Sequence, residues 1–226
     1  MKIVIRLGGS VFCPSGEPDT AYVKKFSEAI LKISAKNEII VVVGGGRMAR
    51  SYIRSALNLG AGREEADWVG ILAARLNAQV LLCSLGKKAC KKPAYTLEEL
   101  SCFCGTGKII VMGGLRPRQT TDAVAMEAAK TIGADLIVKL TNMDGIFDKD
   151  PKAHKDAKLI EKMSPEKLLV MVSADELTPG KSVIVDPVAA KLLAGLKTKM
   201  IIVSAADLKN AEAAIEGKKF RGTVVA

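Results

Sequence analysis

The sequence predicts an α/β protein in which helices cover both faces of a mainly parallel sheet. Short apolar, β-branched runs such as Ile39–Val43 are typical of strands that are buried on both faces of a parallel sheet. Stretches with apolar residues at helical spacing alternate with these runs along the chain. Three of the strand-like runs end in glycines that lead through a polar loop into a helix. The 226 residues contain no linker, repeat or shift in composition, so we expect a single domain with two lobes.

Apolar runs bounded by turn residues predict strands in the first half of the chain at Lys2–Leu7, Glu38–Val43, Val80–Ser84 and Lys108–Met112. Helices are expected between them after Asp19, over Arg47–Leu59 and Glu64–Ala78, and after Thr96. Asp19 is a favoured N-cap, and apolar residues then recur on one helical face. Gly60 and Gly62 separate the two middle helices, while Thr96 and Glu99 stand at the spacing of a capping box.

In the second half of the chain, strands are expected at Asp135–Leu140, Met200–Ser204 and Thr223–Val225, and helices at Ala123–Ile132, after Pro165, after Pro187 and at Leu208–Ile215. Thr121 or Asp122 can cap the first of these helices, and proline is favoured at the first position of the next two. The helix after Pro187 is expected to bury a stripe of Val188, Leu192 and Leu196. Pro179–Ser182 has the composition of a loop.

The composition favours a cytoplasmic protein that binds anions. The formal net charge of +10 suits nucleotides and would also suit nucleic acid, although aromatic residues for base stacking make up only 4%. The chain starts directly with an expected strand, so no signal peptide is predicted. No apolar run reaches the ~18–20 residues that span a bilayer. The five cysteines form no zinc-binding pattern, so we expect no protein-bound metal and mostly buried, reduced thiols.

Three glycine segments, each directly after a predicted strand, are the strongest functional signal. They are Gly8-Gly9-Ser10, Gly44-Gly45-Gly46 and Gly113-Gly114. Glycine lets a backbone turn sharply and lets an anion touch its N–H groups, and a helix that starts there adds the positive end of its dipole. Each segment alone could also be a plain tight turn. Because the carboxyl ends of parallel strands meet at one edge of the sheet, we expect the three segments to converge there.

Several familiar chemistries find no match in the sequence. Neither G-x-x-x-x-G-K-[ST] nor G-x-G-x-x-G is present, which argues against a P-loop and a Rossmann site, and no G-x-S-x-G nucleophile elbow occurs. The single histidine, His154, lies in a charged loop and is expected at the surface, which argues against histidine acid–base chemistry. Glycine loops with Arg, Lys, Ser, Thr and a suitably placed Asp match the needs of phosphoryl transfer, namely charge neutralisation and alignment.

The order of these motifs resembles the archaeal type of uridylate kinase in the amino-acid kinase superfamily. The most specific matches are Gly8-Gly9-Ser10, Val43–Gly46 with Arg50, Gly113-Gly114 with Thr120-Thr121-Asp122, and Thr141–Gly145 with Asp148–Pro151. The resemblance covers essentially the whole chain and implies a three-layer αβα sandwich around a mainly parallel sheet. It also implies phosphoryl transfer from ATP with Mg²⁺ to UMP in pyrimidine biosynthesis, by an N-terminal acceptor lobe and a C-terminal ATP lobe. A homohexamer is implied, and no membrane or nucleic-acid partner.

The same resemblance assigns roles to individual residues. ATP would be contacted by Gly8, Gly9, Ser10, Gly46, Arg50, Thr141, Asn142, Phe147 and Asp150. UMP would be contacted by Gly45, Asp67, Leu115, Arg116, Pro117, Arg118, Gln119, Thr120 and Thr121. The residues at the transferring phosphoryl group would be Arg6, Gly9, Ser10 and Asp144, the last of which would orient a cation or other donors. Asp67 and Asp144 also have ordinary structural interpretations, as a helix N-terminal acid and a turn residue before glycine.

The chain departs from the usual family pattern at three positions. Arg6 stands at or near a position where many relatives carry lysine, so it brings a planar fork instead of a point charge. Phe147 stands where tyrosine is common, so one hydroxyl contact to the nucleotide should be missing. Arg118 replaces a glycine that relatives often have in the acceptor loop, which adds a cation near the acceptor phosphate and calls the backbone shape of this loop into question.

Three other functions are compatible with parts of the sequence. Isopentenyl phosphate kinase shares the ATP lobe, but its acceptor site uses a histidine after the glycine triplet, where this chain has none and carries Asp67. A non-catalytic nucleotide- or oxyanion-binding member of the superfamily is less favoured because Asp144 and Thr141-Asn142 are intact. An RNA-binding regulator would rest only on the net charge of +10.

Overall fold

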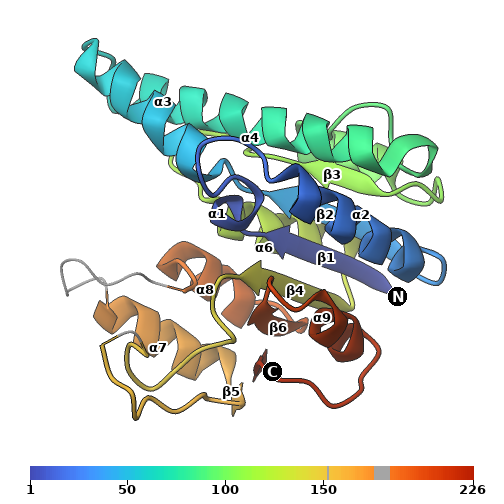
Figure 1. Cartoon of the computed structure of the whole chain (residues 1–226), viewed down its shortest axis with the longest axis vertical. Helices are drawn as coiled ribbons and strands as arrows, with labels where there is room; N and C mark the ends of the chain where they lie inside the picture. Colours follow the sequence, from blue (N-terminus) through green and yellow to red (C-terminus); the bar gives the residue numbers. More distant parts are fainter. Residues whose placement is uncertain (152, 176–183) are drawn as a thin grey trace.

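The strands of the computed structural model, which describes residues 1–151, 153–175 and 184–226, form one seven-stranded sheet in the order β3-β2-β1-β4-β6-β7-β5 (Figure 1). The strands are β1 (Lys2–Leu7), β2 (Glu38–Val43), β3 (Ile110–Met112), β4 (Leu136–Thr141), β5 (Lys162–Met163), β6 (Lys199–Ser204) and β7 (Thr223–Val225). All neighbours pair in parallel except β6 and β7, which are antiparallel. The prediction of a mainly parallel sheet is therefore confirmed.

Helices cover both faces of this sheet, so the expected three-layer sandwich is confirmed. One face packs against α5 (Leu97–Phe103), α6 (Thr121–Ile132), α7 (Pro165–Asp175) and α8 (Pro187–Ala194). The other packs against α1 (Gly9–Phe12), α2 (Thr20–Ser34), α4 (Arg63–Leu85) and α9 (Leu208–Ile215). Helix α3 (Gly46–Asn58) lies along α4, and its far end projects beyond the sheet (Figure 1).

Strand register brings the functional loops to one edge of the sheet. The last residue of β1, Leu7, is level with Val43 in β2 and with Leu140 in β4. Two hydrogen bonds extend these pairings past the strands, since the Gly8 N–H donates to the Leu140 carbonyl at 3.0 Å and the Gly44 N–H donates to the Leu7 carbonyl at 3.1 Å. The loops after β1, β2 and β4 therefore start side by side. Met112 at the end of β3 is level with Val42, so the loop with the third glycine segment starts at the same edge, as predicted.

The expected strand at Val80–Ser84 was wrong, because α4 continues to Leu85. The buried residues at the end of α4 recur at helical spacing, namely Ala78, Leu81, Leu82 and Leu85. The helix ends only at Gly86, whose φ of +58° favours glycine. By length and composition alone, the stretch Arg63–Lys88 could cross a membrane. Its buried side packs against the sheet, however, as the core helix of a globular protein does.

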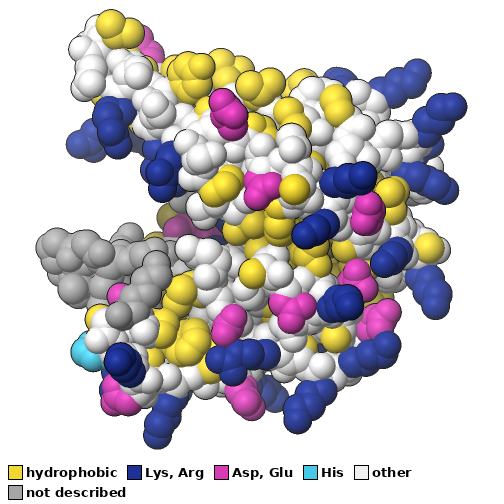
Figure 2. Space-filling view, viewed as in Figure 1, with side chains coloured by type: hydrophobic (Ala, Val, Ile, Leu, Met, Phe, Trp, Pro, Cys, Tyr) yellow, Lys and Arg dark blue, Asp and Glu magenta, His cyan; other side chains and the backbone are white. Residues whose placement is uncertain are grey.

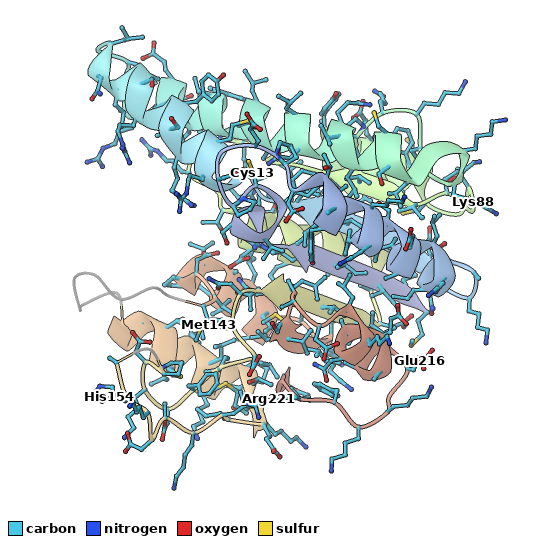
Figure 3. The ribbon with its side chains drawn as sticks, viewed as in Figure 1. Cys13, Lys88, Met143, His154, Glu216 and Arg221 are labelled. Carbon is cyan, nitrogen blue, oxygen red and sulfur yellow. The ribbon has the colours of Figure 1, made fainter. Side chains whose placement is uncertain are left out.

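Three smaller expectations also changed. Of the expected stripe, Val188 is 58% exposed, whereas Leu192 and Leu196 pack half-buried against the core. The fully buried residues of α8 are Ala189, Ala190 and Leu193. The two-residue strand β5 was not predicted. Of the five thiols, all free, only Cys13 is fully buried; Cys83 and Cys102 are exposed, and Cys90 and Cys104 are half-buried. His154 lies at the surface as predicted (Figure 3), and Pro179–Ser182 lies outside the described residues.

Candidate active site

The first two glycine segments touch each other at the carboxyl edge of the sheet. A Cβ atom on Gly9 would lie 2.3 Å from the Gly46 nitrogen, and one on Gly46, whose φ is +67°, would lie 2.2 Å from the Gly9 carbonyl oxygen. The Arg47 N–H also donates to the Cys13 carbonyl at 3.3 Å. No side chain fits between the two backbones, so glycine is required at both positions and the segments are held in direct contact.

The predicted phosphate contacts Ser10 and Arg50 lie on helices that start at these segments. Ser10 is exposed on the short helix α1, which the buried Phe12 anchors in the core. Arg50 is exposed on α3, with Arg47 before it and Arg54 one turn after it. Figure 2 shows Lys and Arg side chains below the projecting end of α3, where the surface is hollowed. This arrangement gives the hollow a cationic rim.

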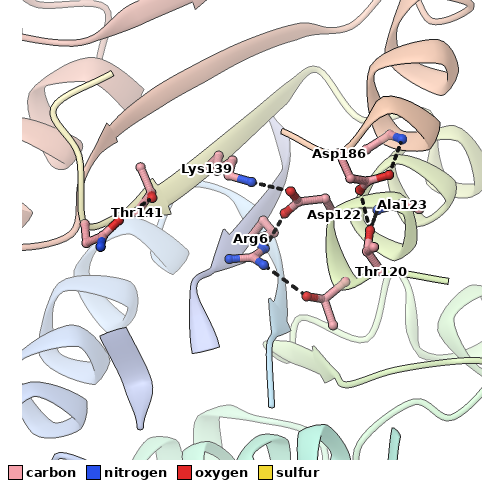
Figure 4. A network of polar contacts seen from close by, with 10 residues as sticks. Arg6, Thr120, Asp122, Ala123, Lys139, Thr141 and Asp186 are labelled. Atoms are coloured by element: carbon pink, nitrogen blue, oxygen red, sulfur yellow. Dashed lines mark hydrogen bonds and ion pairs between the residues drawn. The ribbon is translucent and has the colours of Figure 1, made fainter. Parts of the chain in front are cut away.

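Arg6, Asp122 and Lys139 form a charged cluster beside the first glycine segment, with Asp122 and Lys139 buried and Arg6 half-buried (Figure 4). Arg6 in β1 and Lys139 in β4 are register partners, so both side chains leave the same face of the sheet. Asp122 in the first turn of α6 receives both cations: its Oδ1 lies 2.5 Å from Arg6 Nε, and its Oδ2 pairs with Lys139 Nζ. Arg6 Nη2 also donates to Thr121 Oγ1 at 3.1 Å. Two cations thus share one carboxylate in direct contact, and the Asp186 carboxylate adds a more distant negative charge that also acts on Lys139.

Burial and mutual attraction have opposite effects within this cluster. Burial alone would raise the pKa of Asp122, but the charges of Arg6 and Lys139 outweigh it and hold that pKa below its ordinary value. Burial also lowers the pKa of Lys139 to about 8, against the attraction of Asp122 and with the help of Arg6. Lys139 therefore stays mainly protonated at neutral pH, close to the point where it would lose its charge.

The segment Leu115–Thr121 joins β3 to α6 and packs against α4 through Asp67. The Arg118 N–H donates to Asp67 Oδ2 at 2.8 Å, which brings the predicted ribose ligand to this loop. Arg118 has a φ of +60°, the only positive φ of a non-glycine residue among those described. The loop therefore keeps a conformation that favours glycine, at a cost of roughly 1–2 kcal/mol for a residue with a side chain. In the rest of the loop, Leu115 is buried, Pro117 and Gln119 are half-buried and Arg116 is exposed.

The end of this loop is joined to α8 by Asp186. Thr120 Oγ1 caps α6 by accepting the Ala123 N–H at 3.1 Å and donates to Asp186 Oδ2. Asp186 Oδ1 in turn accepts the Ala189 N–H at 3.0 Å and so caps α8. The sequence indicated only a helix start at Asp186 and gave no signal for its contact with Thr120.

The loop after β4 forms the other half of the site. Asp144 Oδ2 lies 2.8 Å from Nε of Arg221, which Figure 3 labels, and the Ile146 N–H donates to Thr223 Oγ1 at 2.8 Å. The segment that leads into β7 therefore fixes this loop, and the sequence did not predict Arg221 as part of it. Of the predicted ATP contacts here, Asn142 and Asp150 are exposed, and Thr141 and Phe147 are half-buried.

The predicted residues thus lie in the loops after β1, β2, β3 and β4 on one edge of the sheet, and Arg6 and Lys139 of the charged cluster lie on the neighbouring strands β1 and β4. Lys139 was missed, although a lysine inside the apolar run of β4 is a signal that could have found it. Among the described residues, no three His, Cys, Asp or Glu side chains lie close enough to hold a metal ion.

Comparisons with known proteins agree with this architecture. The model of the amino acid kinase family matches residues 1–204. The chain is 41% identical to a uridylate kinase of Methanocaldococcus jannaschii over 204 residues, 90% of each chain. It is 36% identical to that of Methanobrevibacter smithii, covering 100% of this chain and 99% of the relative.

A solved structure gives the same result in three dimensions. The crystal structure of uridylate kinase from Archaeoglobus fulgidus superposes with a TM-score of 0.89 at 37% identity and covers 100% of both chains. The bacterial UMP kinase of Bacillus anthracis, at 21% identity and a TM-score of 0.81, shares the fold. The chain therefore belongs to the amino acid kinase family.

Proposed function

We propose that the protein transfers the terminal phosphoryl group of ATP to UMP, giving ADP and UDP, as a cytoplasmic enzyme of pyrimidine nucleotide biosynthesis. The observation that carries this proposal is the Arg6–Asp122–Lys139 cluster, in which Asp122 and Lys139 are buried, at the edge where the first two glycine segments meet. Similarity to archaeal uridylate kinases over the whole chain supports UMP as the acceptor.

The acceptor would bind against the loop after β3. Asp67 uses Oδ2 for the Arg118 N–H, which leaves Oδ1 to accept a ribose hydroxyl. Arg118 and Arg116 are exposed and would supply cations to the acceptor phosphate, the latter while Nη2 pairs with Glu127. The N–H of Gly45 would contribute from the second glycine segment. Leu115, Pro117, Gln119, Thr120 and Thr121 would complete the wall of this half.

The donor would bind along the loop after β4. Gly8, Gly9, Ser10, Gly46 and Arg50 would hold its phosphates, and Thr141, Asn142, Phe147 and Asp150 its nucleoside. Mg²⁺ prefers carboxylate and phosphate oxygens and would enter with ATP. Asp144 fits a role beside that ion because its side chain is 41% exposed and only Oδ2 is engaged, by Arg221. When bound, Mg²⁺ would neutralise charge on the phosphate oxygens.

The chemistry asked of the protein is mainly electrostatic. Phosphoryl transfer needs alignment and neutralisation of charge on the phosphoryl oxygens, with little covalent participation. Arg6 and Lys139 would supply two positive charges, which Asp122 holds in fixed positions. At neutral pH Lys139 is mainly protonated, so it would act as a fixed cation and not as a general base.

An assay of acceptors tests this proposal. Purified protein with MgATP would be offered UMP, CMP, dUMP and isopentenyl phosphate in parallel, and we expect fast turnover of UMP alone. Asp122→Asn should lower turnover by about a hundredfold or more, as the loss of positioned charge does in other enzymes. Asp156→Asn, at an exposed surface pair, is the matched control and should leave turnover unchanged. Preferred turnover of isopentenyl phosphate, or of no acceptor, would refute the proposal.

We also propose that the chain forms homo-oligomers, with a hexamer as the expected state. Trp68, Leu72 and Leu76 recur along one side of α4 and are 42%, 60% and 56% exposed. A row of large apolar side chains on one helix face is unusual for a monomer and is typical of an interface between subunits. Light scattering on purified protein tests the mass, and Leu72→Glu should dissociate the assembly.

A further inference from the structure

We propose that Arg75 and Asn77 of α4 are positioning residues that aim backbone N–H donors into the acceptor half of the site. The inference rests on the proposed function, because it concerns the same acceptor loops. Neither residue belongs to the predicted set of ligand contacts. Both side chains reach carbonyl groups in the loops that follow strands β2 and β3.

Asn77 holds the second glycine segment. Its side chain is 0% exposed, and its Nδ2 donates to the Gly44 carbonyl at 2.9 Å. Gly44 lies where this segment meets the first one, since a Cβ on Gly44 would be 2.8 Å from the Gly9 nitrogen. A buried amide that reaches a loop at this meeting point fixes the orientation of its peptide group, because a lost hydrogen bond would leave the carbonyl unsatisfied.

Arg75 holds the third glycine segment and the start of the acceptor loop. Its Nε donates to the Gly114 carbonyl at 3.0 Å, and its Nη2 donates to the Leu115 carbonyl at 3.2 Å. The guanidinium lies 4.9 Å from the ring centre of Tyr95 and donates to the carbonyl of the same residue at 3.3 Å. The planar fork of an arginine is needed for this, because a lysine cannot reach two carbonyls and stack on a ring at once.

The fixed carbonyls determine where the adjoining N–H groups point. In a trans peptide the carbonyl of one residue and the N–H of the next point in opposite directions, and the described chain contains no cis peptide. The N–H groups of Gly45, Leu115 and Arg116 therefore point away from α4. Within the described residues, none of these three N–H groups donates a hydrogen bond.

These donors are therefore preorganised for an anionic ligand. All three residues are among the nine that the family resemblance assigns to UMP, and the direction of their N–H groups accounts for that assignment. Donors that are already aligned cost no ordering when the ligand binds. If one of these carbonyls is no longer held, the ligand should lose the free energy of about one hydrogen bond, which corresponds to roughly a tenfold weaker affinity for UMP.

Affinities measured separately for the two nucleotides test this inference. Arg75→Lys keeps the charge and loses the fork, and Asn77→Leu keeps a similar volume and loses the donor without placing a charge in the core. We expect Arg75→Lys to raise the Kd of UMP about tenfold and to change the Kd of ATP less than twofold. For Asn77→Leu, the Kd of UMP should rise by a similar factor and more than that of ATP. Arg63→Lys, an exposed arginine at the start of the same helix, is the control and should change neither.

The outcomes separate positioning from general structural support. Equal weakening of UMP and ATP binding in step with a lower Tm would overturn the inference, and so would wild-type affinity for UMP in both variants. Failure of the wild type to bind UMP would instead sink the proposed function. Inorganic phosphate would then serve as the probe of the same N–H groups, and Arg75→Lys should still weaken its binding relative to Arg63→Lys.

Discussion

Replacing Lys139 by methionine should change how the stability of the protein depends on pH. Methionine has a similar length and no charge, and Asp122 keeps Arg6 as its partner in the variant. The wild-type ammonium is 4% exposed, and its pKa falls from 10.5 to about 8 on folding. Keeping Lys139 protonated in the folded state therefore costs stability below pH 8.

The size of this cost follows from linkage. A difference of 2.5 between the folded and unfolded pKa values corresponds to about 3 kcal/mol at neutral pH. Between pH 8 and 10.5 the unfolded chain binds more protons at Lys139 than the folded one, so stability rises with pH in this window. By pH 9.5 about 2 kcal/mol of the cost should be recovered. The variant has no such group and should lack this recovery.

Urea unfolding at pH 7 and pH 9.5 measures the difference. From the lower to the higher pH, the free energy of unfolding of the wild type should gain about 2 kcal/mol relative to Lys139→Met. All other titrating groups are common to the two proteins, so they cancel in this comparison. Parallel pH profiles would show that Lys139 does not carry the buried charge that we assign to it, and the electrostatic account of the site would fail.

Three further predictions concern the loops. Arg221→Gln should lower kcat/KM for ATP several-fold when it is made in the wild type, because Arg221 holds Asp144 in place. The same change made in the Asp144→Asn variant should have no further effect. Additive effects in this double-mutant cycle would mean that the two residues act independently. Arg118→Gly should raise the free energy of unfolding in urea by about 0.5–1 kcal/mol, because glycine adopts the positive φ without strain. The same variant should have a higher KM for UMP, since it loses a cation near the acceptor phosphate. A lower stability would show that the backbone at Arg118 is not strained. Gly9→Ala should lower the free energy of unfolding by about 3 kcal/mol or more, because the new Cβ would collide with the second glycine segment. Gly195→Ala is the control, since its Cβ would meet no atom closer than 3.4 Å, and it should cost less than about 1 kcal/mol. Equal shifts in Tm for the two variants would argue against the close backbone contact.

The convergence of the loops could be predicted from sequence because it follows from topology. Parallel strands leave their carboxyl ends on one edge, so the glycines after Leu7, Val43 and Met112 had to lie at that edge whatever the details of packing. Helix capping could also be predicted, because it depends only on residues close together in the sequence. Asp19, for example, accepts the Tyr22 N–H within a single turn.

Contacts between residues on different strands could not be predicted from the sequence in this way. Arg6 and Lys139 become neighbours only because β1 pairs with β4, and the sequence does not state which strands pair. Arg221 reaches Asp144 across 77 positions for a similar reason. The false strand at Val80–Ser84 arose because its apolar residues fit a buried strand and a buried helix equally well. Only the length of α4 and the position of Gly86 decide between them.

The buried charge of Lys139 lowers the stability of the protein and is also available to attract an anion. The pKa of Lys139 is lowered because the attraction of Asp122, which Arg6 shares, and of Asp186 only partly offsets the burial of the ammonium group. An anionic phosphate beside the cluster would supply the missing negative charge and should raise that pKa again.

Because binding would then favour the protonated lysine, affinity for ATP should fall as pH rises through about 8 in the wild type, while the phosphates keep their charge. Lys139→Met should bind ATP more weakly at pH 7 and show no such fall. Titrations of ATP at pH 7 and pH 9.5 measure both effects. An equal pH dependence in the two proteins would mean that the ligand does not reach the field of Lys139, and the buried cation would then have no role in binding.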